Sequence, residues 1–120
     1  KVVTMHLVAG PGTKGLISAD QLDLMRPDSI LVNTSRSALI NMTDLQKALA
    51  AGKPGQAVVD VFDIEPLPEK DPLRNTPNLL VTPHLGFIAE PIFATFSKGI
   101  TETLEAWLEQ KPVPHPFKPQ

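Results

Sequence analysis

The sequence predicts an α/β fold in which a parallel sheet is doubly wound and a long helix closes the chain. Four short apolar runs indicate strands, at residues 2–7, 30–33, 57–62 and 79–82. The runs are nearly continuous rather than alternating, which is typical of strands buried on both faces by helices. Helical patterns separate the first three runs, and this order predicts right-handed crossovers between parallel strands.

The first intervening helix is predicted from a capping box. Ser18 and Gln21 have the spacing at which two side chains satisfy the unpaired N–H groups of a helix N-terminus reciprocally. Leu22 and Met25 follow on one face, and Pro27 is expected to end the helix.

The second intervening helix is predicted in the same way. Thr43 and Gln46 repeat the capping box, and Gly52 fits the C-terminal cap because glycine adopts the left-handed conformation at little cost. The apolar face of this helix is formed by Leu45, Ala48 and Leu49.

Residues 63–78 connect the third and fourth predicted strands differently. They hold four prolines, which exclude a regular helix: Pro66, Pro68, Pro72 and Pro77. We therefore expect a long irregular loop, and such a loop inside a compact domain is more often functional than idle.

The longest helix is predicted over residues 91–110, where Pro91 suits the first turn. Its large apolar side chains fall on one face at helical spacing, which predicts packing in a core or against another domain. They are Ile92, Phe93, Phe96, Ile100, Leu104, Trp107 and Leu108. The proline-rich tail, residues 111–120, is expected to be extended and to dock on a part of the molecule outside this chain.

Composition excludes several classes of function. Eleven basic and 13 acidic residues give a net charge of -2, which argues against binding to nucleic acid or to an anionic membrane surface. The absence of cysteine excludes disulfides and thiolate metal sites and is compatible with the cytoplasm. The chain opens directly on a predicted strand without an initiator Met, so we expect a fragment of a longer protein. The alternative is a complete small domain that begins on a strand.

Polar residues collect where the predicted strands end. Residues 34–36 follow the second strand, Asp60 closes the third with Glu65 a few residues on, and residues 82–86 follow the fourth. Because open parallel sheets bind ligands beyond the carboxyl ends of their strands, we expect these side chains to share one rim.

The residue types at this rim suit the reduction of a carbonyl in a small acid. Arg36 presents a fork of donors matched to a carboxylate, and His84 is of the type that exchanges a proton near neutral pH. A neighbouring carboxylate such as Glu65 would favour the imidazolium and fix the ring. Taken singly, Arg36 fits a surface ion pair, Glu65 a solvated loop residue, His84 a backbone-bonded histidine and Asp60 a loop cap.

Four stretches resemble the D-2-hydroxyacid dehydrogenase family. They are residues 3–17, with the strand and Thr13-Lys-Gly-Leu-Ile17; Met25 to Arg36; Val59-Asp-Val-Phe-Asp-Ile-Glu-Pro66; and Asn78-Leu-Leu-Val-Thr-Pro-His-Leu-Gly86. The resemblance implies a partial Rossmann-like sheet. Residues 1–87 would be the C-terminal half of a dinucleotide-binding domain, and residues 88–120 a crossover helix and tail toward an otherwise missing substrate domain.

The resemblance also implies roles for individual residues. Arg36 would bind the substrate carboxylate, His84 would be the general acid/base, and Glu65 its partner. The cofactor, NAD or NADP, would be contacted by Leu7, Thr34, Ser35, Arg36, Asp60, His84 and Gly86. The glycine-rich turn that would hold its pyrophosphate is expected outside this chain.

The chain departs from the family pattern at a few positions. Ser37 and Ala38 stand where the family usually has two glycines, Asn41 where an acid is common, and Gln56 where a small residue is common. These departures put the choice of substrate in doubt more than the class of reaction.

Three functions remain open at this point. The first is a dehydrogenase for glyoxylate, hydroxypyruvate or phosphoglycerate-type acids, expected as a homodimer. The second is an NAD(H)-sensing, corepressor-like binding protein on the same scaffold. The third is an inactive fragment that binds NAD poorly by itself.

Overall fold

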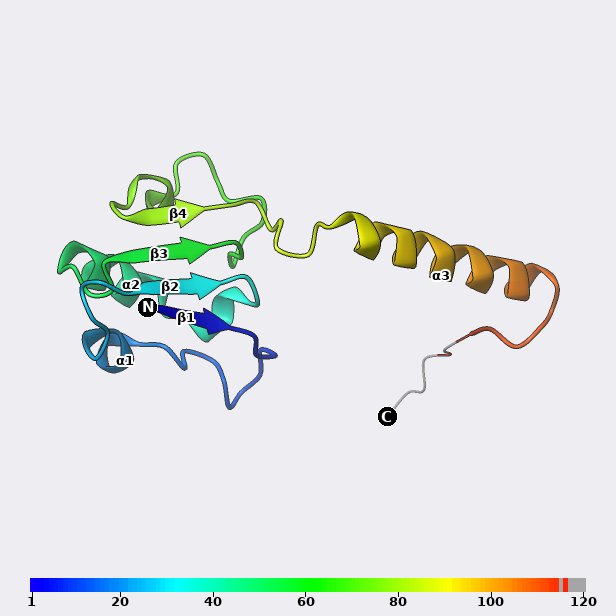
Figure 1. The fold of residues 1–120 in the computed structure, drawn as a ribbon, viewed down its shortest axis with the longest axis horizontal. Coiled ribbons are helices and arrows are strands. Elements are labelled where there is room, and N and C mark those ends of the chain that lie inside the picture. Colours follow the sequence, from blue (N-terminus) through cyan, green and yellow to red (C-terminus); the bar gives the residue numbers. More distant parts are fainter. Residues whose placement is uncertain (115, 117–120) are drawn as a thin grey trace. The chain divides into compact units, whose positions relative to one another are not determined.

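A computed structural model describes residues 1–114 and 116 of the chain. The chain divides into two compact units, one over Lys1–Gly86 and a second that begins at Phe87. The first unit is built on a four-stranded sheet, and the second contains one long helix (Figure 1).

The sheet is wholly parallel, and its strands lie in the order β1-β2-β3-β4 (Figure 1). The strands are β1 (Val2–Met5), β2 (Ile30–Asn33), β3 (Gln56–Val59) and β4 (Leu79–Val81). The predicted parallel α/β fold is therefore confirmed, and β2 has the predicted bounds. The other strands end earlier than predicted. Pairing in the sheet stops at a single row of neighbouring residues, formed by Met5, Asn33, Val59 and Val81.

Helix α1 (Ala19–Asp23) is shorter than predicted and ends before Pro27. The glutamine half of its capping box is formed, because the Gln21 side-chain oxygen accepts the backbone N–H of Ser18 at 3.1 Å. Leu22 is fully buried on the predicted apolar face.

Helix α2 (Met42–Ala50) begins earlier than the predicted capping box allows. Its N-cap is Asn41, whose side-chain oxygen accepts the backbone N–H of Asp44 at 3.2 Å. The prediction that Thr43 caps this helix is wrong, because the asparagine already satisfies a first-turn donor and leaves Thr43 inside the helix. Gln46 bonds instead to the Thr76 hydroxyl, at 2.9 Å.

The C-terminal end of α2 confirms the predicted glycine cap. Gly52 has a φ of 79°, in the left-handed region. Its N–H donates to the Leu49 carbonyl, and the N–H of Lys53 donates to the Ala48 carbonyl, both at 3.0 Å. This pair of bonds is the Schellman arrangement, which satisfies two of the last helical carbonyls.

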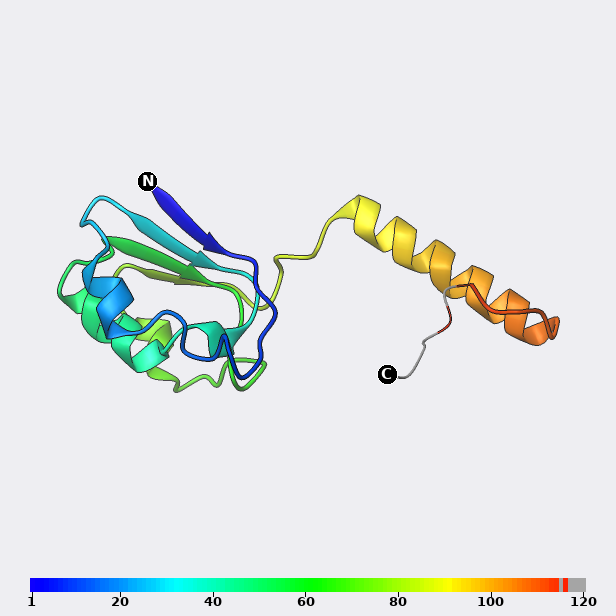
Figure 2. The ribbon, with the colours of Figure 1, turned by 90° about the horizontal axis from the view of Figure 1, so that it is seen from below.

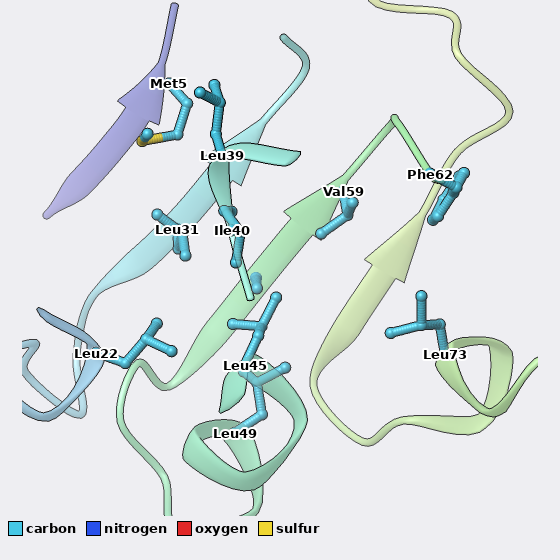
Figure 3. Packing of buried hydrophobic residues seen from close by; sticks show 11 residues of the cluster. Met5, Leu22, Leu31, Leu39, Ile40, Leu45, Leu49, Val59, Phe62 and Leu73 are labelled. Atoms are coloured by element: carbon cyan, nitrogen blue, oxygen red, sulfur yellow. The ribbon is translucent and has the colours of Figure 1, made fainter. Parts of the chain in front are cut away.

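Helices α1 and α2 both cover the same face of the sheet (Figure 2). Figure 3 shows Leu22 of α1, Leu45 of α2 and Leu31 of β2 meeting in the layer between helices and sheet. These side chains belong to one buried apolar cluster, which also includes Leu39, Leu49, Ala57 and Val59.

The opposite face of the sheet corrects the expectation that the strands are buried on both faces. The row Thr4, Val32, Val58 and Leu80 points away from the core, and Leu80 is 58% exposed. Crossovers of one hand between sequential neighbours place their helices on a single face, so the described residues supply no helix to the other.

The segment after β3 is irregular, as predicted, apart from one short 3-10 helix, η2 (Pro72–Asn75). The proline content therefore excluded an α-helix but not a single tighter turn. Asp71 caps this turn by accepting the backbone N–H of Leu73 at 2.9 Å.

Helix α3 (Glu90–Leu108) begins one residue before the predicted start, with Pro91 in its first turn. None of its residues is buried, and Trp107 in the predicted apolar stripe is 68% exposed. Packing in a core is therefore not seen for this stripe, and packing against another domain stays a prediction. His115 and residues 117–120 of the predicted docking tail lie outside the described residues. Among the described helices, none has the length and apolarity that a membrane crossing requires.

Candidate active site

Asp60 occupies the centre of the rim where the strands end. It is 1% exposed, and its carboxylate accepts hydrogen bonds from the Thr82 hydroxyl and from the backbone N–H groups of Leu85, at 2.7 Å, and Gly86, at 2.6 Å. Burial acts to raise the pKa of Asp60, but these bonds together with nearby His84 outweigh it and hold the pKa below its ordinary value. An ionised Asp60 thus ties the end of β3 to the segment after β4.

Gly86 is enclosed by Thr34 and Asp60. A Cβ atom at this position would lie 2.9 Å from Cβ of Thr34 and 3.0 Å from Oδ2 of Asp60, so a larger residue does not fit without a shift. The backbone at residue 86 therefore lies directly against the ends of β2 and β3.

Glu65 and His84 form a hydrogen-bonded pair. Oε2 of Glu65 lies 2.7 Å from Nδ1 of His84, and Oε1 accepts the backbone N–H of Phe62 at 2.8 Å. The bond from His84, followed by that from Phe62, lowers the pKa of Glu65 from its ordinary value against the opposing effect of burial. Both side chains remain partly exposed, at 39% for His84 and 35% for Glu65, so a ligand can reach them.

The backbone of His84 has a φ of 56°, which is uncommon for a residue with a side chain. This conformation follows the turn at Pro83 and is held by the bonds that Asp60 makes to the next two residues. It directs Nδ1 onto Glu65, and a carboxylate at that nitrogen favours the tautomer with a proton on Nδ1.

Arg36 lies at the end of β2, as the N-cap of the 3-10 helix η1 (Ser37–Leu39). Its guanidinium is exposed and folds back onto its own loop, where Nη1 donates to the Ser35 carbonyl at 2.7 Å. The structure thus brings together Glu65 with His84, and Asp60 with residues 82–86, while Arg36 bonds within the neighbouring loop.

Asn33 is a structural residue of the site that the sequence reasoning missed. It is fully buried, its Nδ2 donates to the Arg36 carbonyl at 2.9 Å, and its Oδ1 accepts the Ser35 N–H at 3.1 Å. Its side chain therefore shapes the turn that presents Arg36. The available signal was an asparagine closing an apolar strand directly before a polar turn.

The ends of β1 and β2 are joined by the Ser35 hydroxyl, which donates to the Leu7 carbonyl at 2.7 Å. Leu7 itself is 44% exposed. A further bond links the ends of β2 and β3, since the Ser37 hydroxyl donates to Oδ1 of Asp63 at 2.7 Å. Ser37, which stands where the family usually has glycine, supplies this contact through its side chain.

The glycine-rich segment after β1 differs from what we expected of this chain. Gly10 to Gly15 does have the G-x-G-x-x-G spacing, although such a turn was expected only outside this chain. The segment forms consecutive turns rather than opening a helix, and α1 begins only at Ala19. The spacing therefore occurs without the helix N-terminus that would hold a pyrophosphate.

A cavity of about 350 Å³ adjoins the Glu65–His84 pair. It is lined by Phe62, Glu65, Pro66, Leu67, Pro83 and His84. Its wall is mostly apolar, so the Glu65–His84 pair borders a small hydrophobic surface. The described residues contain no group of three His, Asp or Glu side chains that could hold a metal ion.

The family model for the D-isomer specific 2-hydroxyacid dehydrogenase NAD binding domain matches residues 1–86. A glycerate dehydrogenase of Methylorubrum extorquens is 34% identical over 92% of this chain, and the human glyoxylate reductase/hydroxypyruvate reductase is 35% identical over 90% of it. The chain spans about one third of these relatives, 36% and 33% of their lengths.

A solved structure shows the same backbone arrangement. It is a D-isomer specific 2-hydroxyacid dehydrogenase from Xanthobacter autotrophicus Py2 in complex with NADPH and MES. Its TM-score is 0.72 at 33% identity, with 98% of this chain and 48% of that one covered.

Proposed function

The chain belongs to the D-isomer specific 2-hydroxyacid dehydrogenase family, and from this premise we propose that the protein is an NAD- or NADP-dependent oxidoreductase for a small 2-oxo or D-2-hydroxy acid. The observation that carries the proposal is the Glu65–His84 pair, with 2.7 Å between the carboxylate oxygen and Nδ1. A substrate of the glyoxylate, hydroxypyruvate or phosphoglycerate type fits a site that pairs a guanidinium with an acid/base histidine.

In the direction of reduction, Arg36 binds the carboxylate of the 2-oxo acid through paired hydrogen bonds and holds the adjacent carbonyl beside His84. When bound, the nicotinamide supplies hydride to the carbonyl carbon. As the electron pair of the C=O bond moves to oxygen, the Nε2–H of protonated His84 gives its proton to that oxygen, and the ring later regains a proton from solvent. Oxidation of the hydroxy acid runs through the reverse transfers.

Glu65 keeps the ring of His84 in place during these transfers. Its lowered pKa means that the carboxylate is ionised at neutral pH. The bond at Nδ1 fixes the ring plane, so Nε2 is the nitrogen turned toward a substrate, and the negative charge offsets that of the protonated imidazole. The Phe62 N–H holds the second carboxylate oxygen and keeps Glu65 from swinging away.

The residues at the strand ends fit a nicotinamide cofactor. The close packing of Gly86 against Thr34 and Asp60 brings the backbone itself to the rim, where a planar group can approach it. We propose that Leu7, Thr34, Ser35, Arg36, Asp60, His84 and Gly86 line its site. Asp60 contributes mainly by ordering residues 82–86, since its carboxylate is buried on their donors.

The test is turnover by the full-length protein with glyoxylate, hydroxypyruvate and 3-phosphohydroxypyruvate and either reduced cofactor. His84→Ala should lower kcat by a factor on the order of 10²–10⁴. Arg36→Ala should lower kcat/KM by about 10- to 100-fold, mainly through KM for the oxo acid. Full turnover by both variants would show that the roles are wrong.

Cofactor-dependent binding of a protein partner without oxo-acid turnover would favour the sensing function instead. The cytoplasmic location and the homodimer expected from the sequence belong to the same proposal. Cell fractionation and analytical ultracentrifugation of the full-length protein test them.

A further inference from the structure

Ser37 and Asp63 connect the two halves of the candidate site. The Ser37 hydroxyl donates to Oδ1 of Asp63 at 2.7 Å, across 26 residues of sequence. Ser37 directly follows Arg36, and Asp63 lies two residues before Glu65. The bond therefore joins the loop that carries the guanidinium to the loop that carries the carboxylate partner of His84.

Each of these loops has its own local anchor. Asn33 holds the Arg36 carbonyl at 2.9 Å from its side-chain nitrogen, and Glu65 is fixed to the Phe62 N–H at 2.8 Å. These anchors shape each loop relative to its own strand. The Ser37–Asp63 bond acts between the loops, so it bears on the separation of the two functional groups rather than on the form of either loop.

We propose that the Ser37–Asp63 bond is a latch that positions Arg36 relative to the Glu65–His84 pair. A 2-oxo acid presents its carboxylate and its carbonyl on adjacent carbons, so the guanidinium and the imidazole must keep a fixed spacing to hold both. Ser37 and Asp63 are positioning residues in this role, which rests on the function proposed above. A residue without a side-chain donor at position 37 could not form the latch.

Three variants distinguish an effect of the Ser37–Asp63 hydrogen bond from an effect of the negative charge on Asp63. Ser37→Ala removes the donor, and Asp63→Ala removes the acceptor. Asp63→Asn removes the negative charge but keeps an oxygen that can accept from the Ser37 hydroxyl. If the bond matters, Asp63→Asn should resemble the wild type; if the charge acts directly on Arg36, it should resemble Asp63→Ala.

The experiment uses the full-length protein with bound cofactor and measures steady-state kinetics with glyoxylate and hydroxypyruvate. Ser37→Ala and Asp63→Ala should each raise KM for the oxo acid about 3- to 10-fold, the size expected from one hydrogen bond. Changes in kcat and in KM for the cofactor should stay within about twofold. The double variant should be no worse than either single variant, because both remove the same bond.

Gln46→Ala is the matched control. It removes another long-range side-chain bond, the one from Gln46 to the Thr76 hydroxyl at 2.9 Å. Thr76 lies before β4, so this bond is away from the carboxyl ends of the strands, where the candidate site lies. Its KM should stay within about twofold of the wild type. The latch is overturned if Ser37→Ala behaves like this control, if the two single effects add, or if Asp63→Asn equals Asp63→Ala.

Hydrogen exchange of the amides of residues 36–40 distinguishes failure of the latch from failure of the proposed function. Ser37→Ala and Asp63→Ala should speed exchange in η1, whereas Asp63→Asn should not. A wild type without turnover on any oxo acid overturns the proposed function. Exchange that is equal in all variants overturns the latch, whether or not the protein is an enzyme.

Discussion

The carboxylate of Asp60 accepts the backbone N–H of Gly86 at 2.6 Å, so a buried charge at the end of β3 orders the segment that follows β4. His84 lies within that segment and takes its left-handed conformation there. One side chain at the end of β3 therefore supports the backbone conformation of His84, the proposed acid/base residue, in the segment after β4.

Replacement of Asp60 should destabilise the protein. Asp60→Asn puts an NH₂ group where a carboxylate oxygen now accepts backbone N–H donors, leaving at least one buried donor without an acceptor. The free energy of unfolding should fall by about 1–3 kcal/mol, as measured by urea denaturation of the full-length protein. Glu69→Gln, on the exposed loop, should change it by less than about 0.5 kcal/mol. Equal effects would show that Asp60 has no special structural role.

The pKa values of Asp60 and Glu65 predict how stability depends on pH. Both are lowered in the folded state, so the unfolded chain binds protons more readily as the solution becomes acidic. Their contribution is complete well above the ordinary values of 3.8 and 4.5 and is lost as the pH falls through the lower, folded-state values. Urea denaturation between pH 7 and 3 measures it.

The variants Asp60→Asn and Glu65→Gln should each flatten this acid dependence. The effect of Glu65→Gln should be the smaller, because the Glu65 side chain is about one third exposed and solvent screens its charge. An unchanged slope in both variants would assign the acid dependence to other carboxylates.

Alanine substitutions at Gly86 and Gly99 are expected to change the stability of the protein in opposite directions. Gly86→Ala would press its Cβ against Thr34 and Asp60 and should cost about 1–3 kcal/mol of stability, with a raised KM for the cofactor. Gly99→Ala lies inside α3, where a Cβ meets nothing within 4 Å. It should stabilise the helix by roughly 0.5–1 kcal/mol. Thermal unfolding followed by circular dichroism compares the two, and a destabilising Gly99→Ala would indicate that this helix face is packed against a partner.

Glu65→Gln tests the pairing of Glu65 with His84 separately from stability. The amide keeps an oxygen for the Phe62 N–H but loses the charge beside the imidazole. Turnover of the full-length protein should fall by at least about tenfold, and its pH profile should shift with it. If Glu65→Gln left both turnover and pH profile unchanged, Glu65 would be a loop residue only.

The isolated 120-residue chain is expected to bind NAD poorly and to associate. Its strand ends supply only part of a cofactor site, and several large side chains on α3, among them Phe96 and Trp107, are more than half exposed. Calorimetry with NAD and sedimentation over a range of concentrations measure the two properties. Tight NAD binding, or a strict monomer at high concentration, would contradict these expectations.

Local patterns were sufficient for much of the fold. The apolar run of β2, the glycine cap at Gly52 and the N-terminal Pro91 of α3 are each marked by a pattern within a few residues of sequence, so each could be predicted. The start of α2 could not be predicted in this way, because Asn41 and Thr43 are both residues that favour the N-cap position. In the structure Asn41 is the N-cap and accepts the backbone N–H of Asp44.

The sequence by itself determined that Arg36, Asp60, Glu65 and His84 follow the ends of parallel strands, because alternation of apolar runs and polar turns fixes where strands stop. Only the tertiary structure decided the pairing of these groups. Glu65 reaches His84 across 19 residues, and Asp60 reaches Gly86 across 26. Such bonds depend on the path of the loop after β3 and on the left-handed backbone at His84, which are set by packing between strands rather than by any local pattern.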